Sequence, residues 1–128
     1  MNSPLTHTAP LDSKQLDAMH DHIFARLHQT GQLDGRAFSA GFHDLVAAIE
    51  QDFRREEQLM ETFQCPDSHE HREQHARMQS GLHHAAASLM QGDDGPARKA
   101  LAALADWLPY HISTQDRHLV SALRSALS

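Results

Sequence analysis

The stretch IEQDFRREEQLM, residues 49–60, decides the fold. Ile49 and Phe53 stand one helical turn apart and mark the apolar face of a helix. Asp52 and Glu56 fall on that same face. An unpaired ionised carboxylate in an apolar core is costly, so such groups are normally paired or bound to a metal. The stretch therefore predicts a core helix whose two carboxylates find partners on other helices.

Apolar residues recur at three- and four-residue steps in three further segments, and no stretch shows sustained strand alternation. Gly and Pro gather at the breaks TGQLDG (30–35), CPDS (65–68) and GDDGP (92–96). Short loops between long helices make neighbours antiparallel, which predicts an all-α, up-down-up-down four-helix bundle. Pro109 predicts a kink near His111 or a later helix start. The predicted helices cover 13–29, 37–64, 69–91 and 96–126, within a bundle domain at 12–128 that follows a short N-terminal arm at 1–11.

Composition excludes several classes of protein. The chain of 128 residues suits one domain, and its net charge of -6, without a block of Lys or Arg, argues against nucleic-acid binding. No apolar run approaches the ~18 residues that span a bilayer, and the first residues do not resemble a signal peptide. The single cysteine, Cys65, excludes an internal disulfide and fits a reducing cytosol. We therefore expect a cytoplasmic protein that binds neither membrane nor nucleic acid.

Histidine is over-represented, with 12 in the chain, but position matters more than number. In HREQH the first and last residues, His71 and His75, stand at i and i+4, a spacing that lets two imidazoles reach one metal ion. His20 stands among apolar neighbours, where a lone histidine is more often a core residue than a ligand. His111 and Asp116 lie about 140° apart around a helix. They would contact two different ions or lie on either side of one helix–helix interface.

Taken together, the four predicted helices each turn histidine or carboxylate inward, which predicts a buried metal site. Four histidines and three carboxylates are too many for one tetrahedral zinc. They suit two ions that share bridging carboxylates, and mixed imidazole and carboxylate ligands suit iron or manganese. Glu56 and Asp116 are the natural bridges. The predicted metal ligands are His20, Asp52, Glu56, His71, His75, His111 and Asp116.

The pattern resembles the hemerythrin family, in its bacterial single-domain form. The resemblance runs from about Asp17 to Leu119 and implies two non-haem iron ions with O2 or an oxo or hydroxo bridge, manganese or zinc being alternatives. It implies that the three histidines of the last two helices hold one iron, that His20 binds the second, and that Glu56 and Asp116 bridge them. The motifs that carry it are DAMHDHIF (17–24), DFRREEQLM (52–60), HREQH (71–75) and WLPYHISTQD (107–116).

The sequence departs from the family at Asp52, where the family has a histidine on the second iron. A carboxylate ligand favours Fe(III), can exchange a proton with a bound ligand, and is shorter than histidine, which leaves room for water. Each effect favours oxidising, peroxidatic or sensing chemistry, or a weaker second metal site, over reversible O2 carriage. The residues that match the apolar lining of the family's oxygen pocket are Phe53, Trp107, Leu108 and Ile112.

The leading functional prediction is a di-iron protein that binds O2 or a related small diatomic ligand for storage, delivery or sensing. The second is an enzyme that uses the same irons, namely an oxidase, a peroxidase or a nitric-oxide-handling activity. A metal-storing or structural bundle is the third. Nothing in the sequence identifies a protein partner. Turnover would separate the second reading from the first, and the third predicts no oxygen-dependent spectrum.

Overall fold

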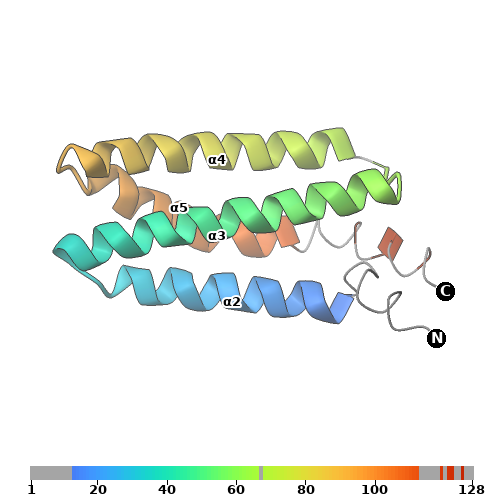
Figure 1. Cartoon of the computed structure of the whole chain (residues 1–128), viewed down its shortest axis with the longest axis horizontal. Coiled ribbons are helices and arrows are strands. Elements are labelled where there is room, and N and C mark those ends of the chain that lie inside the picture. The colour runs from blue at the N-terminus through green and yellow to red at the C-terminus, as the bar shows by residue number, and fades with distance from the viewer. Residues whose placement is uncertain (1–12, 67, 113–118, 120, 123–124, 126–128) are drawn as a thin grey trace, which may run out of the picture.

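The computed structural model describes residues 13–66, 68–112, 119, 121–122 and 125. These residues contain four helices and no strand, which confirms the predicted all-α, four-helix fold. The predicted arm at 1–11 and the predicted ligand Asp116 lie outside the described residues. The helices are α2 (Ser13–Gly31), α3 (Gly35–Thr62), α4 (Ser68–Met90) and α5 (Gly95–His111), as Figure 1 shows.

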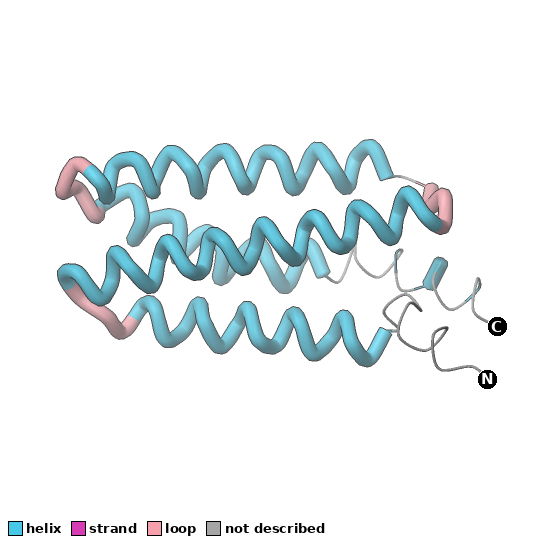
Figure 2. The backbone as a smooth tube through the Cα atoms, viewed as in Figure 1, coloured by secondary structure: helices cyan, strands magenta, loops and turns pink. Residues whose placement is uncertain are grey.

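The helices pack side by side along the length of the molecule (Figure 1). α3 contacts α2 and α4, and α5 contacts the same two helices. The loops after α2 and after α4 lie at one end of the molecule, whereas the α3–α4 connection lies at the other (Figure 2). Each helix therefore presents one face to two neighbours, and residues at the same height on all four helices meet in the centre.

The ends of the helices match the turn residues that the sequence places there. After α4, Gly92 adopts a positive φ of 89°, and the Asp93 N–H donates to the Ser88 carbonyl at 2.9 Å. This left-handed glycine satisfies carbonyls that the end of the helix leaves exposed. Pro96 occupies the first turn of α5, where its missing N–H costs nothing.

Two apolar clusters form the core, and a layer of polar side chains lies between them. Along α3 the larger cluster reaches from Phe38 to Phe53, and the smaller one begins at Leu59. Glu56 lies between them and is 1% exposed. The smaller cluster also contains Cys65, and burial raises the pKa of this thiol. A thiol that resists deprotonation is a poor nucleophile, in keeping with a packing role.

Pro109 lies inside α5, two residues before the helix ends. The helix begins at Gly95 rather than after the proline, so the alternative of a later helix start is wrong. Ile112 is the C-cap residue that follows the helix, and its N–H donates to the carbonyls of Leu108 and Pro109. His111 is consequently held at the last turn of α5. No helix among the described residues combines the length and apolar character needed to cross a membrane.

Candidate metal centre

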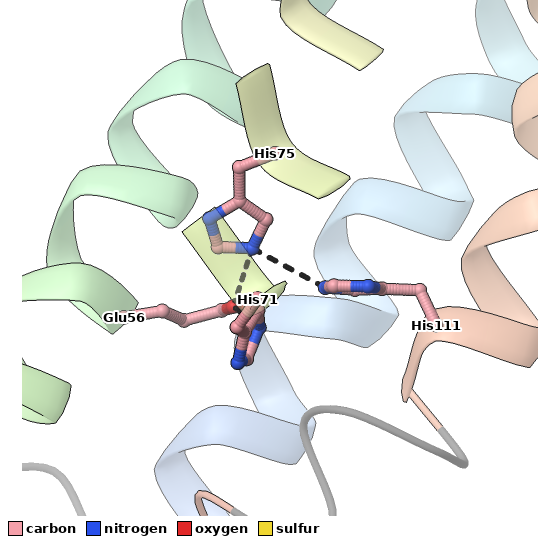
Figure 3. Close-up of side chains that lie close together, drawn as sticks. All are labelled: Glu56, His71, His75 and His111. Atoms are coloured by element: carbon pink, nitrogen blue, oxygen red, sulfur yellow. Dashed lines mark hydrogen bonds and ion pairs between the residues drawn. The ribbon is translucent and has the colours of Figure 1, made fainter. Parts of the chain in front are cut away.

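Three histidines from two helices surround one oxygen of Glu56 (Figure 3). His71 and His75 project from one face of α4, because their spacing of four residues is about one turn. Their Nε2 atoms lie 3.3 and 3.2 Å from Glu56 Oε1. His111 enters from the end of α5, and its Nε2 lies 3.2 Å from that of His75. One ligand atom from each of these four buried residues lies within 4.8 Å of the others.

The other oxygen of Glu56 faces α2. His20 Nε2 lies 3.2 Å from Glu56 Oε2 and 4.0 Å from Asp52 Oδ2. These three side chains are buried and form a second group able to hold a cation. Because Glu56 belongs to both groups, its carboxylate joins two neighbouring sites, one between α3, α4 and α5 and the other between α2 and α3.

The electrostatics of Glu56 keep it ionised in a place where carboxylates are usually neutral. Burial by itself would raise the pKa of this carboxyl. The imidazoles of His20, His71 and His75, whose Nε2 atoms lie 3.2 to 3.3 Å from its oxygens, outweigh burial and hold the pKa of Glu56 well below 4.5. The centre therefore presents an anionic oxygen to the imidazole nitrogens, which is the donor combination that a divalent or trivalent cation requires.

Two side chains orient the imidazoles from behind. His75 Nδ1 donates to Glu57 Oε2 at 2.9 Å, and His111 Nδ1 donates to Gln74 Oε1 at 3.0 Å. These partners occupy the Nδ1 side of each ring and leave both Nε2 atoms directed at the centre, 3.2 Å from one another. A proton or a metal ion between the two nitrogens relieves the repulsion of their lone pairs. The donor set thus fits a metal ion.

Aromatic rings hold two of the imidazoles in place. Phe53 stacks on His75 with ring centroids 3.8 Å apart and planes 4° from parallel. Trp107 stacks on His111 at 4.3 Å and 15°. Phe53 and Trp107 also meet edge to face at 6.1 Å. This packing restricts ring rotation, so the ligand nitrogens converge before any ion binds.

A small pocket lies beside His20 and Asp52. It is too narrow to admit a water molecule, and its walls are otherwise apolar. Three of the four residues predicted to line an oxygen pocket are among its walls, namely Phe53, Leu108 and Ile112. Trp107 is not, because it lies against His111 instead. The remaining apolar lining residues are Ile23, Phe24 and Ile49.

Six of the seven predicted ligands therefore lie in two groups that share Glu56. His28, near the end of α2, is exposed and belongs to neither group. The structure places Glu57 behind His75, where its carboxylate contacts the imidazole nitrogen that faces away from Glu56. Gln74 was not foreseen, because its partner His111 lies 37 residues further along the chain and no local spacing links them.

The fold and the site define a helical protein that binds metal through imidazole and carboxylate groups in its core. The chain matches the hemerythrin family, described as "Hemerythrin HHE cation binding domain", over residues 11–123. Since this match covers most of the sequence, the chain belongs to the hemerythrin family. The searches of curated proteins and of solved structures gave no significant match.

Proposed function

We propose that this chain is a non-haem di-iron protein that binds O2 or a related small diatomic ligand for storage, delivery or sensing. The observation that carries the proposal is the split carboxylate of Glu56. Its Oε1 faces His71 and His75, while its Oε2 faces His20. A carboxylate with imidazoles at both oxygens is arranged to bridge two cations. One cation would leave half of this arrangement unused.

In this proposal each group of residues has a separate task. The histidines of α4 and α5 hold one ion, His20 and Asp52 hold the other, and Glu56 bridges them. Asp116 is proposed as a second bridge by resemblance. Iron held by these residues would supply a redox centre able to bind a small ligand. The proposal includes an up-down-up-down antiparallel order, in keeping with the alternating loop positions in Figure 2, and a cytoplasmic location.

The protein's own contribution to ligand binding is a dry, oriented site. The walls beside His20 are mostly apolar and offer water few hydrogen-bond partners, so a small apolar ligand is favoured over water once side-chain motion opens the pocket. Phe53 serves both purposes, because it lines this pocket and stacks on His75. Glu57 and Gln74 hold the Nδ1 protons of their histidines, which leaves both Nε2 lone pairs directed at the centre.

Asp52 favours a second candidate, an oxidase, peroxidase or nitric-oxide-handling enzyme at the same irons. Its Oδ2 lies 4.0 Å from His20 Nε2, close enough for both groups to reach one ion. A carboxylate there adds negative charge and a proton-accepting oxygen at the edge of the pocket. Both features favour turnover over a stable adduct.

A storage or structural role with zinc is the third candidate, and Glu56 with three histidines is the observation that favours it.

One experiment separates the three candidates. The protein is purified after growth with added iron, reduced without air, and assayed for metal content, with spectra recorded before and after O2 is added. Two irons with a persistent near-ultraviolet and visible charge-transfer band support O2 binding. Two irons that pass directly to a stable ferric spectrum support the enzyme. One ion, or zinc without an oxygen-dependent spectrum, refutes both iron functions.

A further inference from the structure

An open groove lies between α2 and α3, on the outer side of Asp52. Its volume is about 490 Å³, within the range of small-ligand sites. Met19, Ile23 and Ala48 contribute apolar surface, and Asp52 also contributes to its lining. The groove is thus a surface feature that reaches a residue of the candidate metal centre. It is separate from the narrow pocket beside His20, which lies on the inner side of Asp52.

The groove is lined by two arginines, Arg26 and Arg55. Arg26 Nε donates to His22 Nε2 at 3.0 Å, which holds this guanidinium beside the groove. Within the part of the chain that the structure describes, neither arginine lies within 4.0 Å of a carboxylate. Two arginines line this groove although the chain as a whole carries a net charge of -6. Guanidinium groups with donors to spare attract anions and bind them in a fixed geometry.

Only a thin wall separates this groove from the metal centre. Ile23 and Asp52 line the groove and also line the narrow pocket beside His20. They are 4% and 6% exposed, so each presents an edge to the groove while most of its surface is covered. A displacement of these two side chains would connect the groove with the pocket. A ligand taking that route passes directly beside His20.

We propose that this groove is the entrance through which small inorganic monoanions reach the centre, and that Arg26 and Arg55 capture them. The inference rests on the proposed function, because the anion's destination is the ion beside His20 and Asp52. The arginines act as positioning residues: they raise the local anion concentration at the wall formed by Ile23 and Asp52. Two guanidinium side chains and one carboxylate side chain, Asp52, line the groove, so positive side chains outnumber negative ones, and an excess of one sign of charge in a cleft accelerates association in this way.

The test measures how fast azide, a small monoanion, binds the oxidised iron-loaded protein, by stopped-flow absorbance. Arg26→Gln and Arg55→Gln are each expected to slow association about 3- to 10-fold at low salt, with the difference shrinking as salt rises. Dissociation should stay unchanged. Arg54→Gln is the matched control, because Arg54 is exposed, precedes Arg55 and does not line the groove. Nitric oxide, an uncharged probe of the reduced protein, should bind all variants equally fast.

Two results overturn the inference. One is a wild-type azide rate in both groove variants, and the other is an equal slowing by Arg54→Gln. If the wild-type protein binds no iron, or shows no azide band, the proposed function fails and the groove is tested on metal-free protein. There, azide should shift the side-chain Nε–H resonances of Arg26 and Arg55 in NMR spectra, but not that of Arg54. Shifts confined to the two groove arginines support anion capture, and unshifted or uniformly shifted resonances refute it.

Discussion

Removal of the Glu57 carboxylate is expected to weaken metal binding at the His71, His75 and His111 end of the centre. Glu57 Oε2 accepts the Nδ1 proton of His75 at 2.9 Å, while Nε2 of the same ring faces Glu56. Such a carboxylate fixes the tautomer and raises the basicity of a ligating imidazole, and its loss typically costs about 10- to 100-fold in metal affinity. The side chain is 28% exposed, so solvent screens part of the effect. We therefore expect about 10- to 30-fold for Glu57→Ala, near 1.4–2 kcal/mol.

The size of the loss should depend on what replaces the carboxylate. Glu57→Gln keeps an acceptor oxygen but removes the charge, so a smaller loss of about 3- to 10-fold is expected. Glu61→Ala and Glu61→Gln are the matched controls. Glu57 and Glu61 each lie 3.9 Å from an Arg72 nitrogen, but the Glu61 side chain is 80% exposed and pairs with no histidine among the residues that the structure describes. The controls remove the same charge beside the same arginine.

Iron affinity is measured without air by competition between the protein and a chromophoric chelator for Fe(II). Thermal melts of the metal-free variants establish that each one folds. Wild-type affinity in Glu57→Ala would refute the reasoning. So would an equal loss in the corresponding Glu61 variant, because the effect would then come from general surface charge rather than from support of His75.

Three further predictions concern Glu56, Arg98 and Asp52. In metal-free protein the pKa of Glu56 is lower in the folded state than in the unfolded chain, so its ionised carboxylate stabilises the fold above pH 4.5. This contribution is lost as the pH falls through the pKa of the folded state. The melting temperature of Glu56→Gln should therefore converge with that of wild type as the pH is lowered. Arg98 donates to the Leu33 carbonyl at 2.8 Å and lies 3.7 Å above the Phe38 ring. Arg98→Ala should therefore cost about 1–3 kcal/mol in urea unfolding. Asp52→His should slow autoxidation of the iron-loaded protein in air, measured by absorbance.

Each of these predictions has a result that contradicts it. A stability gap between wild type and Glu56→Gln that stays constant from neutral to acid pH would show that its ionisation does not stabilise the fold. Lys99→Ala, a substitution at the exposed residue next to Arg98, is the control for the unfolding experiment. An equal loss of unfolding free energy in both variants would contradict a specific stabilising role for Arg98. If Asp52→His autoxidises as fast as wild type, the carboxylate does not drive the oxidation.

A site residue could be predicted from the sequence where its position follows from the period of its own helix. The helical period alone placed Asp52 and Glu56 on the inner face of α3, and both are buried there. The same period paired His71 with His75. Trp107 and Leu108 show the opposite case. Consecutive helix residues point about 100° apart, so Leu108 lines the narrow pocket while its neighbour stacks on His111.

The sequence by itself determined the helices, their inward faces and the kinds of ligand that those faces carry, because hydrophobic periodicity and turn residues act over a few positions. Only the tertiary structure showed that one oxygen of Glu56 faces His20 while the other faces α4. It alone placed Gln74 behind His111 and brought two arginines to the groove outside Asp52. The physical reason is that these relations join residues on different helices. Their geometry follows from how the helices pack, which no local pattern along the chain records.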